Sequence, residues 1–344
     1  MPGPCVLPGG PHCLRPEGPR YPKSKDGRRE GPITVSDLGE FGLIAALAAR
    51  LPAAPATLLG IGDDAAVLAA PDGRVVASTD LLVEDRHFRR DWSSARDIGG
   101  KAAAQNLADI AAMGAVPTAL LVGLAAPGDL PVAWAEDMAA GLAEECSRVG
   151  ATVAGGDLSG APLIMLAVTA LGDLAGRAPV TRAGARPGDL VAVAGVLGYS
   201  AAGLALLRGG LTEPAGLVAA HRWPHPDYAA GPDAARRGAT SMIDVSDGLV
   251  QDLGHLAEQS GVRIDVASAR LPVSNALRAA ADALGDQDPL DWVLHGGEDH
   301  GLLATFPPGA ALTGRWSVVG QVREGEGVWV DSRRSERLSG WNHF

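Results

Sequence analysis

The sequence predicts an α/β protein with two domains, and three observations support this fold class. The chain has 344 residues, which is enough for two domains of ordinary size. Apolar residues make up 47% of it, so each domain can bury a core. Segments with strand patterns alternate with segments of helical periodicity in both halves of the chain, as in layered folds that pack helices against sheets.

The first half begins with a helix and a hairpin. Apolar residues recur at helical spacing from Ser36 to Arg50 and stop before Pro52, which predicts a helix. Two short strands, Ala65 to Ala70 and Arg74 to Thr79, are expected to pair through the turn Pro71-Asp72-Gly73. By the two-residue period of a strand, Ser78 and Asp80 lie on one side.

Two longer helices follow, and each is expected to end at a glycine. They run from Asp97 to Met113, before Gly114, and from Val132 to Val149, before Gly150. On the first of them Lys101, Gln105 and Asp109 are spaced i, i+4 and i+8, which predicts one polar stripe that is either a solvated face or part of a site. Strands at Ala151 to Ala154 and Leu163 to Leu171 are expected to flank Gly155-Gly156-Asp157.

The second half repeats the alternation after a joint at Pro179 to Gly188. Its expected elements are strand Leu190 to Ala194, helix Ser200 to Leu207, a looser stretch to Pro232, strand Ser241 to Asp244, helix Leu249 to Gln259, strand Val262 to Val266 and helix Ser274 to Leu284. We therefore expect an N-terminal domain over residues 33–178 and a C-terminal domain over residues 179–344. Residues 1–32, rich in Pro, Gly and Arg, are expected to be a disordered basic leader, or the product of a misassigned start codon.

Charge and composition exclude several classes of protein. A net charge of -11 argues against nucleic-acid binding through a broad basic surface. No uncharged apolar run reaches the roughly 18 residues of a membrane span, and no apolar signal core stands at the start, so a cytoplasmic location is expected. The three cysteines show neither a disulfide framework nor a zinc spacing.

Six short acidic clusters beside glycine or other small residues are the most informative motif. They are Gly60-Ile61-Gly62-Asp63-Asp64-Ala65-Ala66, Ser78-Thr79-Asp80, Asn106-Leu107-Ala108-Asp109, Gly155-Gly156-Asp157, Asp244-Val245-Ser246-Asp247-Gly248 and Gly296-Gly297-Glu298-Asp299. Crowded carboxylates repel one another, so a fold that gathers them usually does so around divalent cations. Magnesium is commonly held by a few carboxylates together with substrate phosphates, and the pattern therefore predicts phosphate chemistry.

Each cluster also has a simpler interpretation. Asp244 to Gly248 follows an expected strand and begins a helix, so its side chains could bind cations or only cap the helix. Gly60 to Ala65 superficially fits a dinucleotide-binding fingerprint, which would imply a hydride-transferring enzyme, but that fingerprint must open a helix. His87 alone could be a packing residue, and Gly296 to Asp299 could be an ordinary polar turn.

Taken together, these motifs resemble the thiamine-monophosphate kinases, over about Ile33 to Phe344. Further matches are Thr181-Arg182, Arg186-Pro187-Gly188-Asp189, Ser200 to Leu204 and the ending Trp341-Asn342-His343-Phe344. The resemblance implies a two-domain fold like that of aminoimidazole ribonucleotide synthetase, with an N-terminal mixed sheet that pairs across a homodimer and a C-terminal α/β sandwich. It also implies ATP-dependent phosphorylation of thiamine monophosphate to thiamine diphosphate by direct in-line transfer, with several Mg²⁺ ions and no protein nucleophile.

The resemblance further assigns a role to each matching position. Metal would be held by Asp64, Ser78, Thr79, Asp80, Asp109, Asp157, Asp244 and Asp247. ATP would be contacted by Gly156, Asp157, Arg182 and Ser246, and thiamine monophosphate by His87, Glu298 and Trp341. The alternatives are another ATP-using synthetase of the same superfamily, for selenophosphate or aminoimidazole ribonucleotide, and a protein that binds these ligands without chemistry.

Overall fold

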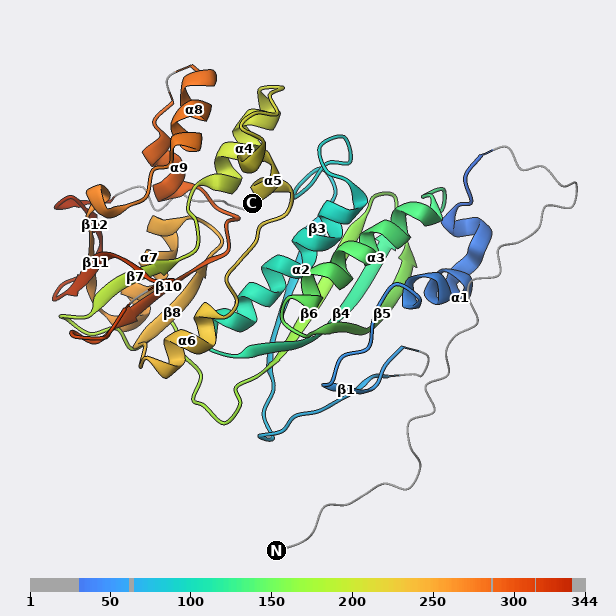
Figure 1. Cartoon of the computed structure of the whole chain (residues 1–344), viewed down its shortest axis with the longest axis horizontal. Coiled ribbons are helices and arrows are strands. Elements are labelled where there is room, and N and C mark those ends of the chain that lie inside the picture. Colours follow the sequence, from blue (N-terminus) through green and yellow to red (C-terminus); the bar gives the residue numbers. More distant parts are fainter. Residues whose placement is uncertain (1–30, 62–64, 286, 313, 336–344) are drawn as a thin grey trace, which may run out of the picture.

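The computed structural model describes residues 31–61, 65–285, 287–312 and 314–335. Within these residues the chain forms a four-stranded sheet, a seven-stranded sheet and a separate strand pair. Figure 1 shows the smaller sheet with its helices on one side of the molecule and the larger sheet on the other. No helix in the described part of the chain is both long and apolar enough to cross a membrane.

The N-terminal half is built on the four-stranded sheet, whose strand order is β3-β6-β4-β5. Its elements are α1 (Val35–Ala48), β1 (Thr57–Leu59), β2 (Val67–Leu68), β3 (Val76–Val83), α2 (Ala95–Ala112), β4 (Val116–Ala126), α3 (Val132–Ser147), β5 (Thr152–Gly160) and β6 (Met165–Asp173). The sheet is mixed, because β4 runs parallel to β5 and antiparallel to β6. Helices α2 and α3 lie side by side across one of its faces (Figure 1).

Local sequence explains where α2 begins and ends. Ser94 caps the helix in a reciprocal capping box with Asp97, and Gly114 ends it with φ +75°. Two glycines let α2 approach α3 closely: a Cβ at Gly99 would lie 1.9 Å from the carbonyl oxygen of Met138, and one at Gly141 would lie 2.0 Å from that of Arg96. The predicted helix is thus confirmed, with its start two residues earlier.

The other face of the four-stranded sheet is not covered by any helix among the described residues, since α2 and α3 both pack on the first face. Strand β3 alternates, with Ser78 and Asp80 half-buried toward α2 and Thr79 and Leu81 exposed on the opposite side. Leu81 is 52% exposed, although leucine is ordinarily a core residue. The open face of the sheet is defined by the outward residues of β3 and by the residues in register with them on the neighbouring strands.

The C-terminal half is built on the seven-stranded sheet, in the order β13-β12-β9-β11-β7-β10-β8. Its elements are β7 (Leu190–Ala194), α4 (Tyr199–Arg208), α5 (Ala215–Arg222), α6 (Ala230–Arg236), β8 (Ser241–Val245), α7 (Leu249–Ser260), β9 (Arg263–Val266), the 3₁₀ turn η1 (Ser268–Arg270), α8 (Asn275–Ala283), α9 (Pro289–His295), β10 (Gly301–Phe306), β11 (Ser317–Arg323), β12 (Gly327–Val330) and β13 (Arg333–Arg334). Among the described strands of this sheet, β9 and β12 pair in parallel and the other neighbours pair antiparallel.

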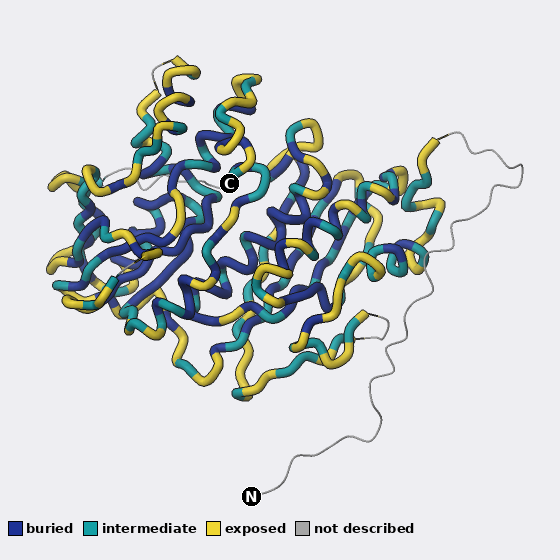
Figure 2. Tube along the Cα trace, viewed as in Figure 1, coloured by how far each residue is buried: buried dark blue, intermediate teal, exposed yellow. Residues whose placement is uncertain are grey.

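Helix α2 belongs to the cores of both halves. One face of the seven-stranded sheet packs on α4, α7, α8 and α9, in a core that includes Ile243 and Leu303. The other face packs on α2 and α6, so that Met242 and Leu302 share a core with Ile110. Figure 2 shows α2 buried along most of its length between the two sheets.

Several expectations about single elements were wrong. The hairpin over residues 65–79 does not form, because β2 pairs with β1 and β3 pairs with β6. Gly155-Gly156-Asp157 lies inside β5 rather than between strands, since its pairing with β4 continues to Gly160. The looser stretch before Pro232 contains α5 and the start of α6. Strand β4 and the elements after α8 had not been expected.

Candidate active site

Three carboxylates meet where α2 crosses the end of β8. Asp109 of α2 accepts a hydrogen bond from the hydroxyl of Ser78 at 2.7 Å, and Asp80 accepts one from the amide of Gln105 at 3.3 Å. Burial, together with the nearby charges of Asp244 and Asp80, raises the pKa of Asp109 to about 7, against the opposing hydrogen bond from Ser78. Strands β3 and β8 and helix α2 therefore bring like charges together, as the acidic clusters predicted.

The polar stripe of α2 faces this site. Gln105 reaches Asp80 and Asp109 reaches Ser78, while Lys101 is only 2% exposed and lies 3.1 Å from the Oε1 atom of Glu298. The solvated-face interpretation of the stripe is thus wrong. One helix supplies a cation, an amide and a carboxylate to the region between the two halves.

Asp244 is joined by a histidine that the sequence reasoning had missed. Nδ1 of His300 lies 3.1 Å from Oδ2 of Asp244, and both side chains are buried. Burial alone would lower the pKa of His300, but its hydrogen bond to Asp244 and the carboxylate charge raise it. The signal in the sequence was the acidic pair Glu298-Asp299, with a histidine directly after it and directly before β10.

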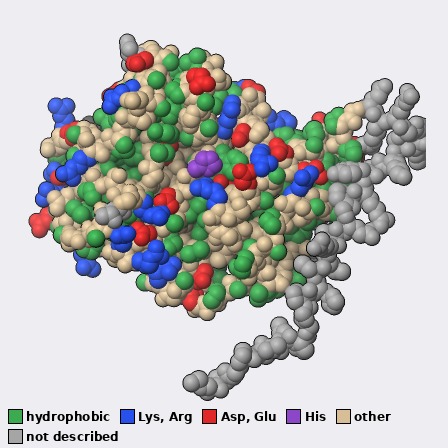
Figure 3. Space-filling model, in the orientation of Figure 1, with side chains coloured by type: hydrophobic (Ala, Val, Ile, Leu, Met, Phe, Trp, Pro, Cys, Tyr) green, Lys and Arg blue, Asp and Glu red, His purple; other side chains and the backbone are tan. Residues whose placement is uncertain are grey.

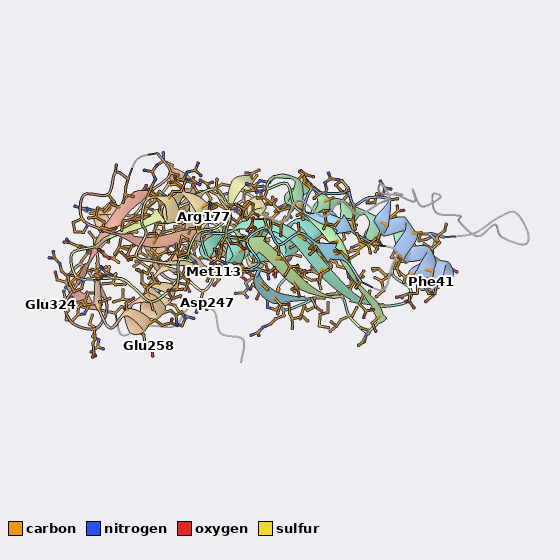
Figure 4. The ribbon with its side chains drawn as sticks, turned by 90° about the horizontal axis from the view of Figure 1, so that it is seen from below. Phe41, Met113, Arg177, Asp247, Glu258 and Glu324 are labelled. Atoms are coloured by element: carbon orange, nitrogen blue, oxygen red, sulfur yellow. The ribbon has the colours of Figure 1, made fainter. Side chains whose placement is uncertain are left out.

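The loop before α7 and the first two turns of that helix form a second group of potential ligands. Asp247, Asp252 and His255 each offer one atom, and these atoms lie within 4.8 Å of one another. Asp252 also accepts hydrogen bonds from the backbone N–H groups of Asp247 and Gly248, both at 3.1 Å. Burial, together with the charges of Asp244 and Asp247, raises the pKa of Asp252 to about 8. Asp252 and His255 had not been singled out, although they are three residues apart on the predicted helix. Figure 4 labels Asp247 near the junction of the two halves.

The turn that carries Glu298 packs on this loop. The N–H of Glu298 donates to the carbonyl of Ser246 at 2.7 Å, and a Cβ at Gly297 would lie 2.4 Å from the same oxygen. Glycine at that position therefore permits a close approach between two loops of the protein. The Glu298 backbone has φ +65°, an uncommon conformation for a residue with a side chain.

His87 lies in the turn after β3. Its Nδ1 atom accepts a hydrogen bond from the N–H of Val83 at 3.0 Å, so this nitrogen carries no proton and the neutral ring is protonated on Nε2. Its backbone carbonyl accepts a hydrogen bond from Lys101 at 3.2 Å. Lys101 therefore contacts both His87 and Glu298, the two described residues that the resemblance assigns to thiamine monophosphate.

Other residues assigned by the resemblance lie elsewhere in the chain. The hydroxyl of Thr79 donates to the carbonyl of Val168 on the open face. Asp157 lies on the edge strand β5, in register with Gly123, and β6 and β4 separate it from β3, a distance of roughly 14 Å at about 4.8 Å per strand. Gly156 is its neighbour on β5 and is in register with Val122.

Arg182 lies at the far end of α7 from Ser246. Its carbonyl accepts a hydrogen bond from Ser260, the last residue of that helix, whereas Ser246 precedes the first turn. Twelve residues of helix separate the two backbones by about 18 Å. The remaining two assigned residues, Asp64 and Trp341, lie outside the described residues.

The residues present fit a hard divalent cation. Asp80, Asp109 and Asp244 supply oxygen ligands, and the raised pKa of Asp109 reflects burial and repulsion that a bound cation would relieve. Mg²⁺ prefers such carboxylate oxygens and keeps room for phosphate oxygens. On the face shown in Figure 3, basic and acidic side chains are mixed, which agrees with an anionic ligand bound through metal rather than through a broad basic surface.

Comparisons with known proteins identify relatives over nearly the whole chain. The N-terminal domain model of AIR synthase related proteins matches residues 62–174, and the C-terminal domain model matches residues 186–330. Thiamine-monophosphate kinase of Mycobacterium tuberculosis is 51% identical over 314 residues, which cover 90% of this chain and 93% of that protein. The enzyme of Corynebacterium glutamicum is 43% identical over 330 residues, 93% of this chain and 97% of its own.

Solved structures agree with these matches. The structure of AaThiL complexed with AMPPCP and TMP aligns with a TM-score of 0.75 at 35% identity, over 92% of this chain and 100% of that one. Thiamine-monophosphate kinase from Stenotrophomonas maltophilia aligns with a TM-score of 0.76 at 34% identity, over 86% of this chain and 98% of that one. Hydrogenase maturation protein HypE, at 20% identity and a TM-score of 0.68, shares the fold.

Proposed function

The chain belongs to the thiamine-monophosphate kinases within the AIR synthase related family, and we propose that it converts thiamine monophosphate to thiamine diphosphate by direct, magnesium-assisted transfer from ATP. The family resemblance and the two-domain fold expected from the sequence are confirmed. The kinase activity follows from relatives up to 51% identical and from a related structure with an ATP analogue and TMP. The meeting of Asp80, Asp109 and Asp244 supports the metal-dependent mechanism.

The reaction needs little covalent chemistry from the protein. An oxygen of the acceptor phosphate attacks the γ-phosphorus of ATP, the bond to the bridging oxygen of ADP breaks, and ADP leaves with the electron pair. The acceptor phosphate is ionised near neutral pH, so neither a protein nucleophile nor a strong general base is required. The protein contributes by positioning two anions, ATP and the acceptor phosphate, and by balancing their charge.

The acidic side chains provide the charge balance. Asp80, Asp109, Asp244 and Asp247, with Ser78, would hold Mg²⁺, which when bound neutralises the phosphate oxygens of both reactants. The metal roles of Asp64, Thr79 and Asp157 and the ATP contacts of Gly156, Asp157, Arg182 and Ser246 stay predictions from the resemblance. The same holds for the acceptor contacts of His87, Glu298 and Trp341. The use of ATP also leads us to keep a cytoplasmic location as a prediction.

One assay separates the proposed reaction from its alternatives. The protein is incubated with ATP, Mg²⁺ and thiamine monophosphate, and we expect thiamine diphosphate and ADP in equal amounts. ATP hydrolysis only with selenide or with formylglycinamidine ribonucleotide would favour another synthetase, and ligand binding without ADP would favour a binding protein. Among the described residues the one free cysteine, Cys146, is buried, and burial raises the pKa of its thiol to about 12, which does not favour selenium chemistry.

The open face of the four-stranded sheet supports a homodimer. Its outward residues include Leu81 at 52% exposure, and the resemblance places a second copy against this sheet. A Leu81→Glu variant is expected to be monomeric where the parent is dimeric, because a carboxylate would be desolvated at the interface. Sedimentation velocity measures the mass, and Phe41→Glu on α1, away from this face (Figure 4), is the control that should stay dimeric. A monomeric parent, or a dimeric Leu81→Glu variant, would contradict this model.

A further inference from the structure

We propose that Lys101 is a positioning residue that sets the placement of His87 and Glu298, and that the affinity for the acceptor phosphate ester depends on its ammonium group. This inference rests on the proposed function, because it assumes that His87 and Glu298 contact thiamine monophosphate. The observation that carries it is a set of three polar contacts around one buried nitrogen. None of the roles assigned by the resemblance includes Lys101.

The ammonium group has an acceptor for each of its three protons. Nζ of Lys101 lies 3.1 Å from Oε1 of Glu298, 3.2 Å from the carbonyl oxygen of His87 and 3.3 Å from that of His221. The side chain is 2% exposed, so water contributes little to this arrangement. A lysine ammonium carries three donors, and here all three are used within the protein.

These contacts join four segments of the chain. Lys101 itself lies on α2, His87 in the turn after β3, His221 in the last turn of α5 and Glu298 in the turn before β10. The first two segments belong to the N-terminal half and the last two to the C-terminal half. The separation between His87 and Glu298 is therefore set through one side chain that both of them contact.

The identity of the cation matters at this position. Beyond residue 25, Lys101 is the only lysine of the chain, and every other side chain with a permanent positive charge is arginine. Arginine presents its donors in a planar fork, which does not match three acceptors arranged around a single point. A compact ammonium does match the three acceptors, which gives a physical reason why this position carries lysine rather than arginine.

The charges in this group balance one another. Burial alone would raise the pKa of Glu298, but the Lys101 ammonium holds it below its usual value, so the carboxylate stays ionised. Burial, and then the same ammonium, lower the pKa of His221 to about 3, so that ring is neutral. The group therefore contains one cation and one anion, and its role is to hold geometry rather than to move a proton.

The test compares kinetic constants for the two substrates. Lys101→Met keeps the length of the side chain and removes the charge, and we expect the KM for thiamine monophosphate to rise by roughly tenfold or more, since a 1 Å misplacement can cost about a hundredfold. The KM for ATP and the Mg²⁺ dependence should change by less than about twofold. Lys101→Arg should not restore acceptor affinity.

Arg148 offers a matched control between the same two halves. It contacts Glu145 of its own helix and donates to the carbonyl of Pro226 at 3.1 Å, so it also joins a carboxylate and a carbonyl across the halves. Arg148→Met should lower the temperature of unfolding without changing the KM for thiamine monophosphate. Such a result separates positioning from general stabilisation.

A double variant separates the loss of positioning from the cost of leaving the Glu298 carboxylate without a cation. Lys101→Met alone leaves the half-buried Glu298 carboxylate without its cationic partner, and Lys101→Met with Glu298→Gln removes that charge. The double variant should regain thermal stability but not acceptor affinity. If it regains both, or if Lys101→Met changes both KM values equally, the positioning role is overturned. A parent protein that makes no thiamine diphosphate would instead overturn the proposed function.

If Lys101→Met does not fold, Lys101→Gln keeps one donor for Glu298 and provides the same comparison. An unchanged KM for thiamine monophosphate in Lys101→Gln, with a reduced temperature of unfolding, would also overturn the inference. A selective rise in that KM, with the KM for ATP preserved, would support it.

Discussion

Replacing Asp109 with asparagine is expected to lower the kcat of thiamine diphosphate formation by about 10²- to 10³-fold, the effect typical of losing one electrostatic contact to a transition state. The amide oxygen can still accept the hydrogen bond from Ser78, so the local fold should persist. The charge next to Asp80 and Asp244 is lost, and metal binding should weaken. Initial rates of ADP formation, measured across a magnesium titration, should show both a lower plateau and a higher half-saturating concentration.

Asp137→Asn is the control for this experiment. Asp137 is an exposed carboxylate on the neighbouring helix α3, and its partner Arg96 lies 3.9 Å away on the surface. Its replacement should leave the rate and the magnesium dependence unchanged. If Asp109→Asn behaved like Asp137→Asn, the carboxylates that meet at α2 would not be metal ligands.

The second large effect concerns stability at the contact between α2 and α3. A Gly99→Ala variant would place a methyl group 1.9 Å from the carbonyl oxygen of Met138, which is backbone and cannot rotate away. The two helices must move apart, and we expect the free energy of unfolding to fall by about 2 kcal/mol, even though alanine favours a helix by about 1 kcal/mol over glycine. Urea denaturation followed by circular dichroism measures this change.

Gly216→Ala provides the matched comparison. Gly216 also lies within a helix, α5, but a Cβ there would have no atom within 4 Å. This variant should be neutral or more stable by up to about 1 kcal/mol. Equal stabilities for the two variants would mean that close approach of the helices does not limit stability.

Local signals in the sequence predicted the regular elements well where periodicity and end signals coincide. Helix α2, whose end at Gly114 was predicted, is one example, and β7 is another. The hairpin over residues 65–79 failed for the opposite reason. A turn signal at Pro71-Asp72-Gly73 says nothing about the distant strand β6, whose pairing with β3 covers eight residue pairs and outweighs it.

Part of the candidate site could also be predicted from the sequence. Asp80, Asp109 and Asp244 stood out as acids beside small residues, and the structure brings them together. His300 and His255 did not stand out, because a single histidine carries no pattern and its role depends on neighbours distant in sequence. The separation of Asp157 from this group depends on sheet order, which residue spacing cannot reveal.

The position of α2 has a consequence for recombination between relatives. Residues 174–189 contain no regular element, and the matches to the two domain families end and begin there, so a crossover in this segment would look harmless in an alignment. The helix contributed by one parent would nevertheless have to fit against β8 and β10 from the other. Chimaeras of divergent parents should thus misfold unless α2 travels with the downstream sheet.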